Sequence, residues 1–180
     1  MAMELTHYIG GKHVKGGSGR FVEVFNPATG EVSGQVPLAN ADEVNAVIAN
    51  SQAAFHAWAA TPAPKRAAIM FSMREVMTQK KDTLAEAISQ EHGKTFEDAK
   101  GEVQRGIEVV EYATGITDSL KGDHSASVGT NVDSYSMRQP LGVCAGITPF
   151  NFPAMVPMWM YPVAIACGNT FVLKPSEKDP

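Results

Sequence analysis

Three polar residues of this sequence could carry out chemistry. Asn151 lies inside a stretch without charged residues, and Lys174 and Glu177 lie just beyond that stretch. Residues 139–173 contain no Asp, Glu, Lys, Arg or His, and Asn151 interrupts them. Asn151 either caps a helix whose first turn holds Pro153, or points its side-chain amide at a developing oxyanion. Beyond the stretch, Lys174 and Glu177 form either a surface ion pair or a pair that flanks a nucleotide ribose.

Arg105 is a further candidate, in a predicted helix that contains several glycines. Its simplest interpretation is an exposed arginine that pairs three residues away with Glu102 or Glu108. Each glycine inside a helix costs roughly 1 kcal/mol relative to Ala, so the glycines indicate close packing against another element. They are Gly101, Gly106 and Gly115.

No other spacing matches an established catalytic or metal-binding motif. The GxGxxG, GxxxxGK, HExxH and GxSxG patterns are absent, and the five histidines show no ligand spacing, so we expect no metal site. Cys144 and Cys167 form no CxxC pair. We expect both to be reduced, structural thiols of a cytoplasmic protein.

Composition and charge argue against nucleic-acid binding, a secretory signal and a membrane span. The net charge of −4 gives no nucleic-acid signal. The first residues lack a basic segment followed by an apolar core, so we expect no secretory signal. Residues 139–173 have the length and apolarity of a membrane span, but four of their five prolines, which lie in the interior, and Asn151 argue against one. These four prolines are Pro149, Pro153, Pro157 and Pro162.

The uncharged stretch is better explained as a strand, a helix and a second strand. We expect these elements over 142–148, 153–167 and 169–173, because apolar and β-branched runs are bounded there by Gly, Pro and Asn. Strands without alternation are typical of buried parallel sheets, so the unit is predicted to be a βαβ crossover. Ligands of such sheets bind outside the carboxyl ends of the strands, which places 148–151 and 174–177 on one rim.

The preceding residues are predicted to form hairpins and helices. We expect hairpins over 7–14 and 21–36 and a helix that opens at Asn40, with Glu43 completing a capping box. Further helices are predicted from Lys65, over about 82–92 before Gly93, and from Thr95 to about Leu120. The predicted inward-facing residues of the first helix are Val44, Val47, Ile48, Ser51, Phe55 and Trp58; those of the second are Ala68, Ile69, Phe71, Met73, Val76 and Met77; those of the last are Val103, Ile107, Val110 and Ala113.

Two features indicate contact with protein outside these 180 residues. Residues 133–138 alternate and could pair with 126–128 to form a projecting ribbon, whose usual partner is a neighbouring subunit. One βαβ unit supplies two parallel strands, too few for a stable buried sheet. We therefore expect the chain to be the amino-terminal piece of a longer protein.

Two segments resemble a known family. Residues 149–177, PFNFPAMVPMWMYPVAIACGNTFVLKPSE, and residues 91–113, EHGKTFEDAKGEVQRGIEVVEYA, are similar to the aldehyde dehydrogenases, in particular the CoA-acylating methylmalonate-semialdehyde branch. The resemblance implies an α/β fold: an incomplete Rossmann-like coenzyme-binding domain with N-terminal hairpins and helices. It divides the chain into 1–121 (the first part of that domain), 122–140 (an oligomerisation β-ribbon) and 141–180 (the first βαβ unit), with the catalytic domain absent.

The resemblance also implies roles for individual residues. Asn151 would help form an oxyanion hole, and Arg105 would recognise a substrate carboxylate. Lys174 and Glu177 would hold the adenosine ribose of NAD. An acidic residue at this position favours NAD over NADP, because it suits a 2′-hydroxyl and not a 2′-phosphate. The remaining cofactor-binding residues implied are Ile147, Thr148, Pro149, Phe150 and Ser176.

The implied chemistry is the NAD-dependent oxidation of methylmalonate or malonate semialdehyde. A cysteine thioester would transfer its acyl group to CoA and yield propionyl-CoA or acetyl-CoA. Neither Cys144 nor Cys167 matches the motif of that cysteine, which the family places beyond Pro180, so we expect the 180-residue chain alone to be inactive. A hydrolytic aldehyde dehydrogenase and a non-catalytic oligomerisation module are the alternatives.

Overall fold

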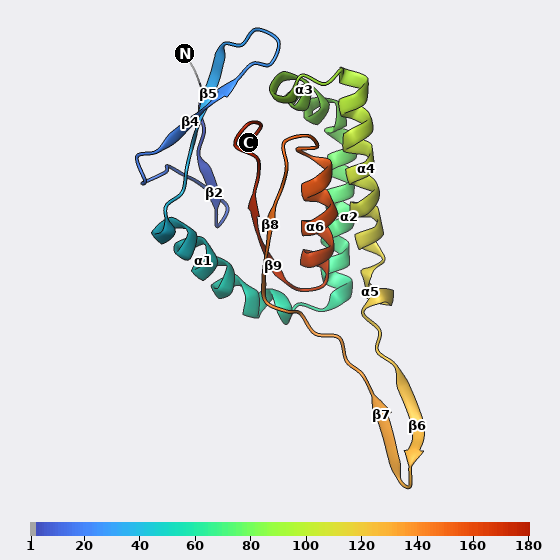
Figure 1. Ribbon diagram of the computed structural model, residues 1–180. Coiled ribbons are helices and arrows are strands. Elements are labelled where there is room, and N and C mark those ends of the chain that lie inside the picture. Colours follow the sequence, from blue (N-terminus) through green and yellow to red (C-terminus); the bar gives the residue numbers. More distant parts are fainter. Residues whose placement is uncertain (1–2) are drawn as a thin grey trace.

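The computed structural model describes residues 3–180; the first two residues of the unit predicted over 1–121 lie outside this range. Within it, four small sheets accompany six helices (Figure 1). The strands are β1 (Met3–Glu4), β2 (His7–Ile9), β3 (Lys12–Val14), β4 (Phe21–Phe25), β5 (Val32–Pro37), β6 (His124–Gly129), β7 (Val132–Tyr135), β8 (Val143–Ile147) and β9 (Thr170–Lys174). The helices are α1 (Ala41–Ala59), α2 (Ala63–Gln79), α3 (Lys81–His92), α4 (Phe96–Thr114), α5 (Ile116–Ser119) and α6 (Met155–Ala166).

Both predicted N-terminal hairpins are confirmed. β2 and β3 pair antiparallel around Gly10 and Gly11, whose φ angles of 57° and 77° favour glycine. β4 and β5 form the second hairpin, with a register shift at Val24 and Phe25. β1 adds a parallel edge to β5, a pairing that a two-residue strand gives no pattern to predict.

The helix ends follow the predicted capping. The Asn40 side chain accepts a hydrogen bond from the Glu43 amide at 2.9 Å, and the Glu43 carboxylate accepts one from the Asn40 amide at 2.9 Å, so the capping box is confirmed. α3 ends before Gly93, which adopts the left-handed conformation at φ 85°. α2 begins two residues before the predicted Lys65, because a proline in the first turn needs no hydrogen-bond donor.

The predicted inward faces of α1 and α2 are only partly buried. Val44 and Ile48 are 47% and 45% exposed, and α1 contains no fully buried residue. This helix lies against β8 and β9, and two strands are too narrow to cover it. On α2, Met70 is buried, Met73 packs against the same cluster and Met77 packs against the cluster of α3 and α4, whereas three other large hydrophobic side chains are exposed. These exposed residues are Ile69, Phe71 and Val76.

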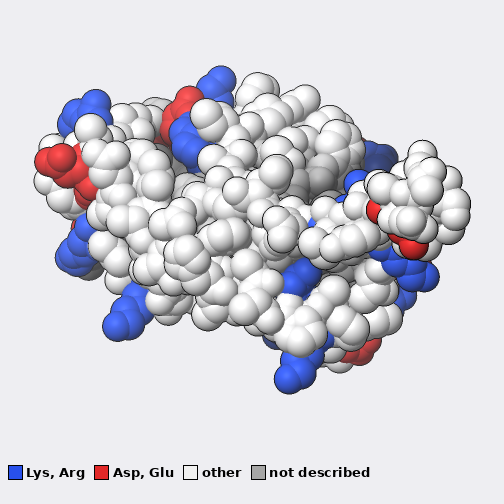
Figure 2. Space-filling model, turned by 90° about the horizontal axis from the view of Figure 1, so that it is seen from below, with Lys and Arg blue, Asp and Glu red and all other residues white. Residues whose placement is uncertain are grey.

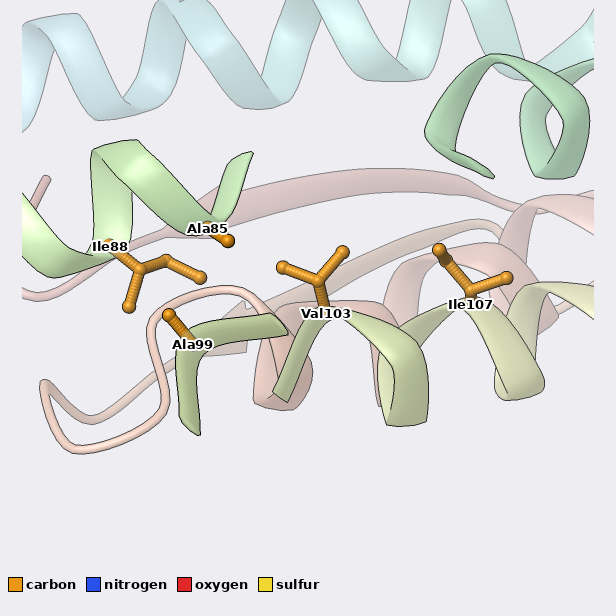
Figure 3. Packing of buried hydrophobic residues seen from close by; sticks show 5 residues of the cluster. All are labelled: Ala85, Ile88, Ala99, Val103 and Ile107. Carbon is orange, nitrogen blue, oxygen red and sulfur yellow. The ribbon is translucent and has the colours of Figure 1, made fainter. Parts of the chain in front are cut away.

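The predicted buried face of α4 is confirmed. Val103 and Ile107 pack with residues of α3 in the main hydrophobic cluster (Figure 3). Of the three glycines, Gly106 is where another element comes close: a Cβ there would lie 2.5 Å from the sulfur of Met158 on α6. Gly101 has no such neighbour, since its nearest atom is Nη2 of Arg105 at 4.0 Å.

The prediction that this helix continues to about Leu120 is wrong. α4 ends at Thr114, and Gly115 adopts φ −88° and ψ 10°, outside the α-helical range. The short α5 follows, and its Ile116 packs in a second buried cluster with Met70, Ala113 and Ala166. Burial of Ile116 therefore accompanies the change in helix direction.

β6 and β7 form an antiparallel ribbon that projects from the rest of the molecule (Figure 1). Every residue in both strands is exposed. The strands of the ribbon predicted over 122–140 thus span 124–129 and 132–135, without tertiary cover from the rest of residues 3–180. Figure 2, which views the molecule from the ribbon's end, shows a largely uncharged surface with Lys and Arg scattered near its margins.

The uncharged stretch folds as the predicted strand–helix–strand unit. β8 and β9 pair parallel, from Val143 opposite Thr170 to Ile147 opposite Lys174. α6 lies on one face of the pair and α1 on the other, while α2 and α4 pack behind α6 (Figure 1). Across residues 3–180, no helix combines the length and apolarity that crossing a bilayer requires.

Candidate functional site

The ends of β8 and β9 bring the two predicted polar segments to one edge. Ile147 lies opposite Lys174, and the Thr148 amide donates to the Lys174 carbonyl at 3.1 Å. The loop that carries Asn151 and the loop that carries Glu177 therefore leave the sheet side by side. This is the carboxyl edge of a parallel pair, where α/β sheets bind ligands.

The predicted rim residues differ in exposure. Ile147 is 80% exposed and Pro149 is also exposed, whereas Thr148 is buried with a hydroxyl that has no hydrogen-bond partner within residues 3–180. Phe150 stacks on the His92 ring, with centroids 5.8 Å apart, and the Lys178 ammonium lies 4.7 Å from the Phe150 centroid. Ile147 and Pro149 thus present an open apolar surface at the end of β8.

Lys174 and Glu177 form an ion pair of 2.8 Å, and both side chains are about half exposed. The hydrogen bond from Lys174 is the main cause that lowers the pKa of Glu177, so its carboxylate is charged at neutral pH. Ser176 is buried, and its hydroxyl accepts a hydrogen bond from the Lys178 amide at 3.0 Å. The Ser176 side chain therefore shapes the turn that presents Glu177.

Asn151 is exposed, and its side chain forms no hydrogen bond within residues 3–180. The interpretation of Asn151 as a helix cap is wrong: α6 begins at Met155, and its N-cap is Ala154, which has no capping side chain. The Asn151 backbone carbonyl instead accepts a hydrogen bond from the Lys94 ammonium at 2.7 Å. Its side-chain amide is left free to donate to a ligand.

Glu102 caps α6 from another helix, a role that its spacing from Arg105 does not indicate. One oxygen of its fully buried carboxylate accepts from the amides of Ala154 and Met155 at 2.9 and 3.1 Å, and the other binds the Lys94 ammonium at 2.5 Å. A negative charge suits this position because helix N-termini carry a partial positive charge. The available signal was its place on the apolar stripe of α4, three residues after the buried Ala99.

Arg105 does not form the predicted ion pair with Glu102 or Glu108. Glu102 is bound by Lys94, and within residues 3–180 no carboxylate lies within ion-pair distance of the Arg105 guanidinium. Arg105 is exposed, with Nη1 4.0 Å from the sulfur of Met155, the first residue of α6. The guanidinium therefore lies beside the end of α6 that follows Asn151.

A cavity of about 480 Å³ lies behind the rim. Two of its acidic groups are unusual, because burial raises the pKa of Glu91 and of Asp179. Both carboxylate oxygens of Asp179 lack a hydrogen-bond partner within the described residues. The cavity is lined by Val22, Glu23, Phe25, Pro27, Glu91, His92, Phe150, Glu177, Lys178 and Asp179.

The two cysteines are free thiols away from the rim. Cys144 lies within β8, and Cys167 caps the carboxyl end of α6, at the opposite end of this helix from Asn151. Burial raises the pKa of the Cys167 thiol, which disfavours the nucleophilic thiolate. Neither cysteine is placed to react with a group held near Asn151.

Comparison with known proteins gives a consistent result. Residues 13–180 match the Aldehyde dehydrogenase family. The chain is 54% identical over 176 residues to malonate-semialdehyde dehydrogenase of Pseudomonas aeruginosa, covering 98% of this chain and 35% of the relative. It is 48% identical over 180 residues to the acylating, mitochondrial methylmalonate-semialdehyde dehydrogenase of Arabidopsis thaliana, covering 100% of this chain and 30% of the relative.

A solved structure extends the similarity to the fold. A Sinorhizobium meliloti 1021 protein assigned as a methylmalonate-semialdehyde dehydrogenase, in complex with NAD, superposes with a TM-score of 0.98 at 50% identity. The superposition covers 100% of this chain and 37% of that protein. The chain thus spans about a third of the length of the relatives it matches and has the fold of that part.

Proposed function

Because this chain belongs to the aldehyde dehydrogenase family, we propose that it is part of an enzyme that oxidises malonate or methylmalonate semialdehyde with NAD and transfers the acyl group to CoA. The observation that carries the proposal is the gathering of three features at one end of the β8–α6–β9 unit. These are the exposed Lys174–Glu177 pair and, without partners among residues 3–180, the side-chain amide of Asn151 and the guanidinium of Arg105. The names of the relatives supply the substrate class.

The rim suits a dinucleotide that carries a 2′-hydroxyl. Lys174 and Glu177 stand at the carboxyl end of β9, and the charged Glu177 carboxylate accepts hydrogen bonds from a ribose but repels a 2′-phosphate. The open surface at Ile147 and Pro149 would border the nicotinamide side, with Thr148 buried between them and Phe150 exposed next to Pro149. NAD, when bound, accepts the hydride that the aldehyde carbon loses.

Asn151 would stabilise the oxyanion that forms when a thiolate adds to the aldehyde. Addition forms a carbon–sulfur bond and places the negative charge on the former carbonyl oxygen, toward which the free amide can donate. A donor of this kind is worth about 10²–10³ in rate in other enzymes. Loss of hydride then leaves a thioester, and the thiol of CoA displaces the enzyme sulfur. Since Cys144 and Cys167 lie away from the rim, the attacking cysteine would lie outside residues 1–180.

Arg105 would select aldehydes that carry an acid group. A guanidinium presents paired donors to a carboxylate, and Arg105 stands beside the first residue of α6 without an ion-pair partner within residues 3–180. During the reaction the bond from the carboxylate to its neighbouring carbon breaks, carbon dioxide leaves and that carbon takes up a proton. Malonate semialdehyde thus yields acetyl-CoA and methylmalonate semialdehyde yields propionyl-CoA.

The ribbon of β6 and β7 would pair with a second copy of the chain. All of its residues are exposed, and its outer strand edges carry hydrogen-bonding groups that an added strand would satisfy. We propose a homo-oligomer assembled through residues 122–140.

The test is an assay of the purified enzyme that contains this chain, with each semialdehyde and NAD, in the presence and absence of CoA. NADH formation accompanied by acetyl-CoA or propionyl-CoA, identified by mass spectrometry, is the expected result. Formation of the free acid with no acyl-CoA would favour the hydrolytic alternative. The isolated 180-residue chain, assayed in parallel, should give no turnover; activity there would contradict the placement of the nucleophile.

A further inference from the structure

A buried ion pair contacts the backbone on both sides of the Asn151 loop. The Lys94 ammonium makes three contacts at once: Glu102 at 2.5 Å, the Asn151 carbonyl at 2.7 Å and the face of the Phe152 ring at 3.9 Å from its centroid. These partners lie in α4 and in the loop between β8 and α6. The ammonium therefore holds the backbone at Asn151 and the side chain of the residue that follows.

The other half of the pair fixes the far end of the same loop. The Glu102 carboxylate accepts from the amides of Ala154 and Met155 through the oxygen that does not bind Lys94. Lys94 and Glu102 are joined to each other, so the loop is held at both ends by one unit. Both side chains are largely shielded from water, 15% and 1% exposed, and such contacts are screened less than surface pairs.

The loop has little else to hold Asn151 in place. The Asn151 side chain is unbonded within residues 3–180, α6 has no side-chain cap of its own, and the neighbouring Pro149 offers no amide donor. An oxyanion donor must be held within a fraction of an ångström to be effective, because misplacement by about 1 Å can cost about 10²-fold in rate. The position of the Asn151 amide thus depends on the contact to its own carbonyl.

We propose that Lys94 and Glu102 are positioning residues that hold Asn151 as the oxyanion donor. The inference rests on the function proposed above for Asn151. It assigns the pair a role in the rate of the chemical step, and neither side chain needs to touch the substrate.

A double-mutant cycle in the enzyme that contains this chain tests the proposal. Lys94→Met keeps an apolar stem under Phe152 and removes the ammonium, and we expect kcat to fall about 10–100-fold with KM for aldehyde and NAD changed less than about threefold. In an Asn151→Ala background, Lys94→Met should lower kcat by less than about twofold, because the group that it positions is gone. Glu102→Gln keeps the shape and one acceptor oxygen and should show the same dependence on Asn151, which provides a second test if Lys94→Met folds poorly.

Lys100→Met is the matched control. Lys100 also forms an ion pair, with Asp82 at 2.9 Å, and also lies over an aromatic ring, that of Phe96, but it does not contact the Asn151 loop. This variant should leave kcat within about twofold of the parent enzyme. Thermal unfolding of each variant separates loss of folded protein from loss of rate.

The outcomes separate the two proposals. If Asn151→Ala alone leaves kcat unchanged, the role of Asn151 and the function proposed for the rim fail. If Asn151→Ala lowers kcat but Lys94→Met and Glu102→Gln have no effect, or have the same effect in both backgrounds, the positioning role is wrong while the role of Asn151 stands. A loss of similar size in Lys100→Met would also overturn it, since a lysine of α4 that does not contact the Asn151 loop would then have the same effect.

Discussion

Replacing Arg105 with Ala tests the proposed substrate class most directly, because the structure predicts little cost to folding. The guanidinium is exposed on α4, and its nearest side-chain partner is the Met155 sulfur at 4.0 Å. Glu102 is already bound by Lys94, so the substitution breaks no ion pair within residues 3–180. Ala is the strongest helix former, and the free energy of unfolding should change by no more than about 0.5 kcal/mol.

The effect on an acidic substrate should be much larger. Hydrogen bonds between a guanidinium and a carboxylate contribute about 1.5–3 kcal/mol. Because Arg105 is open to solvent, we take the lower end of this range. Since about 1.4 kcal/mol corresponds to a factor of ten, kcat/KM for malonate semialdehyde should fall about tenfold. The loss should appear mainly in KM, because the carboxylate is bound equally in the ground and transition states.

The measurement compares steady-state NADH formation on malonate semialdehyde and on propionaldehyde, which lacks the acid group. Propionaldehyde kinetics should change less than about twofold, and Arg105→Lys should lose less than Arg105→Ala because it retains the charge but not the paired donors. Arg74→Ala is the control, since it removes an arginine that pairs with Glu111 on the far part of α4. An equal loss on both aldehydes would show that Arg105 is structural and refute the reasoning.

Two further predictions concern stability. Gly101→Ala should raise the free energy of unfolding by up to about 1 kcal/mol in denaturant titrations, whereas Gly106→Ala should lower it by about 1 kcal/mol, because overpacking against Met158 outweighs the helix-propensity gain; a gain at both positions would contradict the close packing of α4 on α6. Asp179→Asn should stabilise the protein at pH 7, and the gain should vanish below about pH 4. Burial raises the pKa of Asp179, so the folded state holds this proton to a higher pH than the unfolded chain and loses stability as the pH rises through the folded pKa. Thermal melts of both proteins across this pH range test the sign, and a stabilisation that persists at pH 3 would count against it.

The sequence allowed the βαβ unit and its rim to be predicted because their signals are local. Gly and Pro bound the apolar runs of β8 and β9, and the absence of alternation indicates strands covered on both faces. The capping box at Asn40 and the left-handed Gly93 are equally local. Each of these features depends on residues within a few positions of one another, which is the range over which sequence patterns are informative.

The features that could not be predicted from the sequence depend on contacts between different elements of the fold. Arg105 and Glu102 are three residues apart on one helix, which made an ion pair the simplest expectation. Lys94 binds Glu102 instead because the carboxylate faces the core, toward the start of α6. The inward face of α1 was overestimated for a related reason: periodicity identifies an apolar face but does not say how much sheet is available to cover it.

Contacts with distant residues also explain how α6, which contains no charged side chain, is bound at both ends by charged side chains of other helices. α6 contains no ionisable group apart from Tyr161, yet Glu102 from α4 binds its amino end and the buried Arg66 from α2 donates to the Ala166 carbonyl at its carboxyl end, at 2.9 Å. An anion at the first turn and a cation at the last both favour the helix dipole. The two ends of α6 are therefore held by residues 52 and 100 positions earlier in the chain than their partners, and it is the Glu102 contact that lies next to the Asn151 loop. α4 thus does more than pack behind α6: its Glu102 binds the amino end of the helix that follows the proposed oxyanion donor.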